Sequence, residues 1–149
     1  MINSKIKEFL EGIHGIIMGT RDAVLKPDYC RVLGFEQMDD RHLRFFIDKD
    51  SNTSTMENLA DNGMIALVMA KPNFECYQFK GRCVSVTKAI EADDQSVSAY
   101  LKDLNEVVLQ MGVKDGSVYN FPHANICTIL MDVQEIFDQT PRMGTGNKI

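Results

Sequence analysis

The sequence predicts a mainly β protein: a six-stranded antiparallel barrel with flanking helices, in one domain that spans residues 1–149. Three observations predict this fold. Six segments have the length and apolar pattern of strands, hairpin-sized loops join most of them, and only three segments have helical spacing. No repeat, linker or low-complexity segment divides the chain, whose 149 residues are enough for one hydrophobic core.

The first half of the chain alternates apolar segments with polar turns. A helix is predicted over residues 3–13, because apolar side chains recur on one face at helical spacing. Strands are predicted over residues 15–20, 29–37 and 42–48. Pro27 lies in the polar segment between the first two strands, where its fixed φ angle suits a turn.

The second half adds two helices and three strands. The helices are predicted over residues 55–62 and 93–111, and the strands over residues 64–70, 74–87 and 125–137. Gly81 interrupts the longest of these strands and predicts a bend or a β-bulge there. A polar tail over residues 141–149 follows the last strand.

The composition weighs against several classes of function. The net charge is −5, whereas binding to a nucleic-acid backbone requires clustered Lys and Arg. No apolar run is long enough to span a membrane. The N-terminal segment lacks the long apolar core of a signal peptide, so a cytoplasmic location is expected.

The four cysteines do not predict a metal site. They stand at positions 30, 76, 83 and 127, form no C-x-x-C pair and have no histidine at ligand spacing. All four lie in apolar segments, so buried reduced thiols are expected.

Several short motifs occur in a fixed order between residues 13 and 87. They are T-R-D, then P-x-x-x-R-V-x-G-F, then L-x-F-F-x-D before a Ser/Thr-rich loop and N-L, and finally F-K-G-R. In this order and spacing they resemble the pyridoxamine 5′-phosphate oxidase-like superfamily of FMN-binding split barrels. The resemblance covers about half of the chain.

The resemblance implies a homodimer with FMN in clefts at the subunit interface, and an oxidoreductase that acts on a small substrate. Pyridoxamine 5′-phosphate oxidases proper have a C-terminal segment rich in Arg and Trp. This chain has no Trp, so vitamin B6 oxidation is not the expected reaction. A non-catalytic flavin- or haem-binding sensor module on the same fold is the alternative, and a deazaflavin is an alternative cofactor.

The resemblance places Arg31 at the FMN phosphate, where a planar guanidinium can bind two oxygens at once. From the residue alone, a surface charge paired with an acidic neighbour is the alternative. The resemblance places Val32, Leu33 and Gly34 on the strand that passes the flavin ring, where the small glycine lets a ring approach. Barrel core and a bulge glycine are the alternatives.

Three further flavin contacts come from the resemblance. Phe46 and Ile47 match the end of the strand that lines the flavin, although ordinary core packing also explains them. Gln78 lies near the position of a glutamine that hydrogen-bonds the flavin ring, and a shift of register would give that position to Cys76. By period two, Gln78 shares a face with Cys76 and Lys80.

The segment DSNTSTMENLADNG, residues 50–63, has four hydroxyl side chains directly before a helix. The resemblance places Thr53, Ser54 and Thr55 at the phosphate-binding turn. Hydroxyls and free N–H groups at a helix N-terminus favour an anion, while a simple helix cap needs only one hydroxyl. Many relatives have basic residues in this loop, whereas here Lys49 is the nearest cation.

Overall fold

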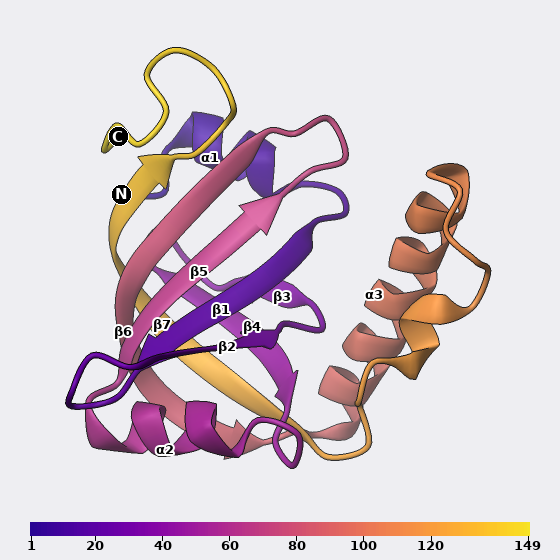
Figure 1. Ribbon diagram of the computed structural model, residues 1–149, viewed down its shortest axis with the longest axis horizontal. Coiled ribbons are helices and arrows are strands. Elements are labelled where there is room, and N and C mark those ends of the chain that lie inside the picture. Colours follow the sequence, from indigo (N-terminus) through magenta and orange to yellow (C-terminus); the bar gives the residue numbers. More distant parts are fainter.

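The computed structural model describes residues 1–149 and confirms a mainly β architecture. One strongly curved antiparallel sheet has the strand order β2-β1-β5-β6-β7-β4-β3 (Figure 1). Its strands are β1 (Gly15–Arg21), β2 (Pro27–Arg31), β3 (Phe35–Gln37), β4 (His42–Asp48), β5 (Met64–Ala70), β6 (Cys76–Lys88) and β7 (Ile126–Asp138). The helices are α1 (Ser4–Leu10), α2 (Thr53–Asp61), α3 (Glu91–Gln110) and the 3₁₀ turn η1 (Ser117–Asn120).

The prediction of a single strand over residues 29–37 is wrong, and this makes the strand count seven instead of six. The chain pairs with β1 as β2, leaves that ladder, and pairs with β4 as β3. Residues 31–34 connect the two and are called the crossover below. Gly34 has a φ of +117°, a conformation that side chains disfavour, and it redirects the chain at this point.

The crossover is hydrogen-bonded on both sides. The Val32 N–H donates to the carbonyl of Ile16 on β1 at 3.1 Å. The next N–H, of Leu33, donates to the carbonyl of Phe46 on β4 at 2.8 Å. Val32 and Leu33 are therefore bonded to β1 and β4, two strands that are not neighbours in the sheet. The crossover fixes how far apart these two strands lie.

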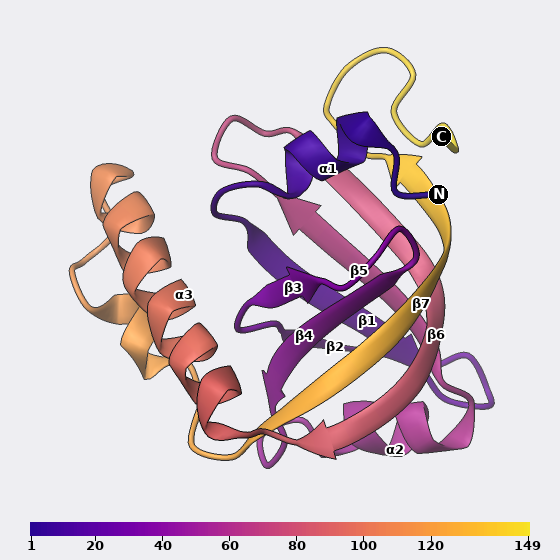
Figure 2. The same ribbon diagram turned by 180° about the vertical axis from the view of Figure 1, so that it is seen from behind.

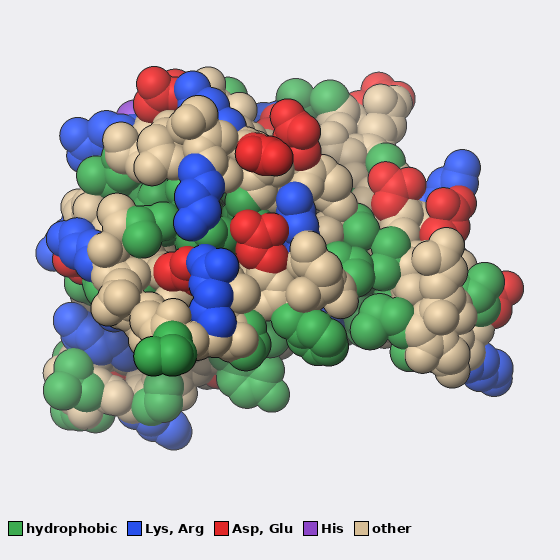
Figure 3. Space-filling model, turned by 90° about the horizontal axis from the view of Figure 1, so that it is seen from above, with side chains coloured by type: hydrophobic (Ala, Val, Ile, Leu, Met, Phe, Trp, Pro, Cys, Tyr) green, Lys and Arg blue, Asp and Glu red, His purple; other side chains and the backbone are tan.

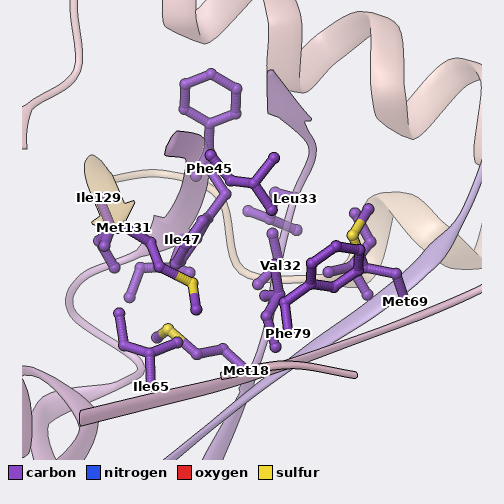
Figure 4. Close-up of a cluster of buried hydrophobic side chains, with 14 of the residues drawn as sticks. Met18, Val32, Leu33, Phe45, Ile47, Ile65, Met69, Phe79, Ile129 and Met131 are labelled. Carbon is purple, nitrogen blue, oxygen red and sulfur yellow. The ribbon is translucent and has the colours of Figure 1, made fainter. Parts of the chain in front are cut away.

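The inner faces of the strands enclose the main core. In Figure 4, side chains from β1, the crossover, β4, β5, β6 and β7 point toward one another; they are Met18, Val32, Leu33, Phe45, Ile47, Ile65, Met69, Phe79, Ile129 and Met131. The predicted bulge at Gly81 is confirmed by a register shift in the β6–β7 ladder. A Cβ at this glycine would lie 1.9 Å from the carbonyl oxygen of Asp132, so only glycine fits.

The helices cover the ends and one side of the barrel. Both views show α2 at one end and α1 beside the C-terminal tail at the other, so the two termini lie close together (Figures 1 and 2). Helix α3 and η1 stand to one side, and the space-filling view shows them projecting from a body on which charges of both signs are interspersed (Figure 3). No helix is both long enough and apolar enough to cross a membrane.

Two smaller expectations need correction. The helix predicted over residues 3–13 ends at Leu10, because Glu11 is already extended. The cysteines are all free, but only Cys30 and Cys127 are buried, whereas Cys76 and Cys83 are partly exposed.

Candidate functional site

Two hollows lie beside the crossover, one at each end. The first, here called the Arg31 cleft, has a volume of about 300 Å³ and is lined by Tyr29, Cys30, Arg31, Leu33, Ser51, Asn52, Phe121 and Pro122. The second, here called the α3 cavity, has a volume of about 260 Å³ and is lined by Gly12, Ile13, His14, Gly34, Phe35, Glu36, Phe46, Ser96, Ala99, Tyr100 and Asp103. Four of the predicted site residues line one hollow or the other.

Arg31 lies exposed at the end of β2. The central carbon of its guanidinium is 4.2 Å from the centre of the Phe121 ring. Stacking uses the flat face of the guanidinium and leaves its N–H edge free for an anion. The alternative, a charge paired with an acidic neighbour, does not hold, because Arg31 is absent from the ion pairs that the structure forms.

The hydroxyl-rich segment divides into two groups. Ser51 and Asn52 face the Arg31 cleft, whereas Thr53 and Ser54 are exposed at the start of α2 without lining it. Thr55 is fully buried, and its hydroxyl donates to the Asp28 carboxylate at 2.7 Å. It therefore ties α2 to β2 and has no free hydroxyl proton for a ligand.

Asp48 holds this loop in place. Its carboxylate accepts hydrogen bonds from the Ser51 hydroxyl at 2.6 Å and from the Asn125 N–H at 3.0 Å. Burial alone would raise the pKa of Asp48, but these bonds outweigh it, so the pKa lies below its ordinary value. The loop is consequently built on an ionised carboxylate, whose oxygens fix the Ser51 backbone.

Four of the predicted flavin contacts are core residues. Val32, Leu33, Phe46 and Ile47 are 0–1% exposed. Three of them, Val32, Leu33 and Ile47, are drawn among the core side chains of Figure 4, and the Phe46 carbonyl accepts the Leu33 N–H. The N–H groups of Val32, Leu33 and Phe46 already donate to protein carbonyls. A ligand beside the crossover would therefore meet main-chain atoms and not these side chains.

An aromatic ring does approach Gly34, and it belongs to Tyr100 of α3. A Cβ at Gly34 would lie 3.2 Å from the Tyr100 Cβ. The Tyr100 hydroxyl donates to the carbonyl of His14 at 2.8 Å, so α3 is fastened to the start of β1. Burial raises the pKa of Tyr100 to about 12, and the nearby charge of Arg31 acts in the opposite direction.

Gln78 is separate from both hollows. It lies half-buried on the outer face of β6 with Cys76 and Lys80, as period two predicts. It lines neither the Arg31 cleft nor the α3 cavity. The outer face carries a third hollow, of about 700 Å³, whose lining includes Gly19, Ala66 and Lys80. This hollow is called the outer hollow below.

Several residues of these hollows were missed by the sequence reasoning. Ser51 and Asn52 were missed because the loop was aligned on the helix that follows it. Phe121, His14 and Tyr100 come from segments distant in sequence, and no local pattern marks them as neighbours of the crossover.

The fold is shared with several solved structures. HupZ of Group A Streptococcus is 16% identical, with a TM-score of 0.59 and coverage of 99% of both chains. A Clostridium acetobutylicum protein related to general stress protein 26 of B. subtilis, of the pyridoxinephosphate oxidase family, is 14% identical, with a TM-score of 0.58 and coverage of 97% of this chain and 91% of that one. A pyridoxamine 5′-phosphate oxidase-related, FMN-binding protein of Nostoc punctiforme is 16% identical, with a TM-score of 0.51 and coverage of 95% and 81%.

At these identities the structural likeness shows the fold alone. A search of curated proteins found no match to this chain. The family model for pyridoxamine 5′-phosphate oxidase, however, matches residues 2–127, which include every strand up to the start of β7 and both hollows at the crossover. The chain therefore belongs to the pyridoxamine 5′-phosphate oxidase family.

Proposed function

We propose that this protein binds FMN beside the crossover, with the phosphate in the Arg31 cleft, and that it is an oxidoreductase acting on a small substrate. One observation carries the proposal: Arg31 has no acidic partner and shares its cleft with Ser51 and Asn52, directly before α2. Membership of a family with FMN-binding relatives supports the choice of cofactor.

The chemistry of the Arg31 cleft suits a phosphate. The first N–H groups of α2 have no partner within the helix, and Asn52 does not cap them with its side chain. These N–H groups and the helix dipole favour an anion, and Arg31 adds a full positive charge. Ser51 and Asn52 line the same cleft, but the Ser51 hydroxyl donates to Asp48 and the Asn52 amide to the Asp48 carbonyl, so the phosphate would rely on Arg31 and backbone N–H groups.

A bound flavin would supply the hydride and electron transfer, and the protein would supply placement and exclusion of water. The crossover offers main-chain atoms at a rigid point of the sheet, because it is hydrogen-bonded to both β1 and β4. Gly34 and Phe46 line the α3 cavity next to it, so a substrate there would lie against the predicted flavin contacts.

A second copy of the chain is part of this proposal. The outer hollow lies on the outward face of β1, β2, β5 and β6, and Tyr29 on that face is 75% exposed. Exposed apolar surface of this kind marks an interaction site. We propose that a partner subunit covers this face and that Gln78 contacts flavin only in the assembled homodimer.

The proposal is tested by titrating the purified protein with FMN and with riboflavin, which has the same ring without the phosphate. We expect Arg31→Ala to weaken FMN binding by about tenfold to a hundredfold, because a charge-assisted hydrogen bond contributes about 1.5–3 kcal/mol. Riboflavin binding should stay unchanged. Arg82→Ala, which removes an exposed arginine of β6, is the matched control.

Two results would contradict the proposal. If wild-type protein takes up neither flavin, the flavin role is wrong. If Arg31→Ala weakens FMN and riboflavin equally, the phosphate does not lie in the Arg31 cleft. Haemin is added in a parallel titration, where a Soret band without flavin uptake would indicate haem as the ligand.

A non-catalytic flavin-binding module is the second candidate. The observation in its favour is that residues 50–61 contain no Lys or Arg, so the phosphate seat has fewer cations than in many relatives. Anaerobic addition of NADH or NADPH to the flavin-loaded protein separates the two candidates. Bleaching of the flavin band supports an oxidoreductase, whereas bleaching by dithionite alone supports the module.

A further inference from the structure

A further pocket, of about 220 Å³, lies at the end of the barrel that α2 covers and is called the α2 pocket below. It is lined by Lys49, Met56, Val86, Thr87, Lys88, Asn125, Ile126 and Cys127. None of these residues lines the Arg31 cleft, the α3 cavity or the outer hollow. The α2 pocket is therefore separate from the surfaces to which the proposed function assigns the flavin and the partner subunit.

The register of the sheet brings two lysines to this pocket. Lys88, the last residue of β6, is paired with Cys127 of β7. The Lys49 N–H, just after β4, donates to the Asn125 carbonyl at 2.8 Å. Directly paired residues of antiparallel strands share a face, and so do residues two apart. The two lysines consequently share a face of the sheet, with Lys49 on the β4 side of β7 and Lys88 on the β6 side.

Both ammonium groups are available for a ligand. Lys49 and Lys88 are exposed, and neither takes part in the ion pairs that the structure forms. Glu57 and Glu91 lie close to lining residues in the chain, but neither lines the pocket. The lining contains no Asp and no Glu at all. Unpaired positive charges at the rim of a pocket attract an anion.

The two acidic neighbours of Lys49 in the chain are hydrogen-bonded to Asn125. Asp48 accepts from its backbone N–H at 3.0 Å, and Asp50 accepts from its side-chain amide at 2.9 Å. Burial raises the pKa of Cys127 in the pocket wall to about 11. The charge of Lys49 lowers this pKa by more than the charge of Asp48 raises it. At the wall of the pocket, Lys49 therefore outweighs Asp48.

The rest of the α2 pocket offers apolar surface. Met56 of α2 packs over Cys127, with 3.9 Å between the two sulfur atoms. Val86 adds a branched side chain from β6 that is 40% exposed. The volume is below that of a pocket for a drug-sized ligand, so it suits a body of only a few carbon atoms. The pocket thus combines a short apolar wall with two cations.

We propose that the α2 pocket binds a small dicarboxylate. Each carboxylate pairs with one of the two lysines, and the carbon chain between them packs against Met56 and Val86. Two carboxylates match this pocket better than one, because Lys49 and Lys88 approach from opposite sides of β7 and each has its own charge. The site lies outside the Arg31 cleft, so binding does not require FMN.

Glutarate is the probe, and two compounds with the same five-carbon chain are its controls. Pentanoate keeps one carboxylate, and 1,5-diaminopentane replaces both carboxylates with ammonium groups. In isothermal titration calorimetry of the full chain, pentanoate should bind about threefold to fivefold more weakly than glutarate, in keeping with the loss of one solvent-exposed ion pair. The diamine should not bind. Equal binding of glutarate and pentanoate, or no binding of glutarate, would overturn the proposal.

Lys88→Gln removes one of the two charges and keeps most of the side chain. It should weaken glutarate binding about threefold to fivefold, to the level of pentanoate. Lys102→Gln removes an exposed lysine of α3 outside the pocket and should have no effect. Equal effects of the two variants would reduce the attraction to net charge and contradict a specific site. Loss of glutarate binding in Arg31→Ala would place the anion in the Arg31 cleft and contradict it as well.

A nuclear magnetic resonance measurement locates the ligand. In protein labelled with ¹³C at the methionine methyl groups, the Met56 resonance should move on addition of glutarate, while that of the fully exposed Met143 should not. An unchanged Met56 resonance in protein that binds glutarate would place the ligand elsewhere and overturn the proposal. The titrations are done with and without FMN, and glutarate binding in protein that takes up no FMN would leave this inference standing while the proposed function fails.

Discussion

Two residues of the crossover have opposite surroundings. The Arg31 guanidinium has an open N–H edge and no acidic partner, whereas Gly34 is enclosed by Tyr100 and Phe46. At Arg31 the chain keeps a charge available, and at Gly34 it keeps a backbone shape that other residues adopt only with strain. The first feature concerns ligand binding, and the second concerns how the sheet is held together.

Gly34→Ala should lower the free energy of unfolding by about 1–3 kcal/mol, through backbone strain and a contact of 3.2 Å with the Tyr100 Cβ. Urea denaturation measures the loss. Gly12→Ala is the control, because Gly12 also has a positive φ but has nothing within 4 Å of an added Cβ. An equal loss in both variants would show that the contact with Tyr100 contributes nothing.

His14 should make stability depend on pH. Burial lowers its pKa from the ordinary value of 6.5, with the hydrogen bond to Phe9 acting in the opposite direction. The unfolded chain therefore takes up a proton more readily than the folded one. The free energy of unfolding should be fully present above pH 6.5 and fall as pH drops through the folded pKa.

Urea denaturation at pH 7.5 and at pH 5.5 measures this effect. His14→Gln keeps a donor for the Phe9 carbonyl but does not titrate, so its stability should change less between the two values. His123→Gln removes an exposed histidine and should behave like the wild type. The interpretation is wrong if His14→Gln retains the full dependence on pH.

At the scale of elements, strong apolar periodicity in the sequence predicted helices and strands correctly. The sequence did not show which strands hydrogen-bond to one another. The helix predicted over residues 93–111 and the strands over 42–48 and 64–70 agree with the structure to within two residues. The break in the strand over 29–37 was not predicted, because Val32 and Leu33 are apolar residues that suit a continuous strand. Whether they pair with β1 or β4 is decided by segments distant in sequence.

The residues of the candidate site also fall into those that the sequence predicted and those that depend on packing. Arg31, Gly34 and Phe46 were expected near a ligand and do line the two hollows. The role of Thr55 could not be foreseen, because its partner Asp28 lies on β2 and depends on how α2 packs against that strand. Local sequence thus indicated which residues were unusual, and packing decided which of them are free to bind.

The hydrogen bond from Thr55 to Asp28 should contribute measurably to the stability of the protein, beside the bond from Asn58 of α2 to Thr20 of β1. Thr55→Val removes the hydrogen bond to Asp28 in a fully buried position and should cost about 1–3 kcal/mol. Thr53→Val changes an exposed threonine of the same helix and should stay within about 0.5 kcal/mol of the wild type. Thermal unfolding compares the two. Similar losses would show that the loss comes from helix propensity and not from the tie.

At the scale of the whole molecule, the barrel presents two different sides. Helix α3 covers the side that contains the α3 cavity, and the outer hollow leaves the opposite strands uncovered. The small residues Gly19 and Ala66 line this hollow, as does the exposed Tyr29. A partner subunit on this face would complete the molecule.

Ala66→Glu should therefore convert a dimer into a monomer, since it places a charge in the middle of the proposed interface. Sedimentation velocity measures the change, and FMN affinity should fall with it because the proposed flavin site lies at that interface. Ser98→Glu adds the same charge to the exposed side of α3 and should leave both unchanged. A wild-type protein that sediments as a monomer would contradict the proposed assembly.

The closeness of the two chain ends, visible in Figures 1 and 2, has a use in protein engineering. The first residues are held by the bond from Ile2 N–H to the Asp40 carbonyl, and the last by the bond from Ile149 N–H to the Ile136 carbonyl. A short flexible linker can join them, and new ends can be opened in the exposed turn at residues 22–26. Such a circular permutant would keep the crossover intact while α1 and β1 would be synthesised last, after β7, instead of first.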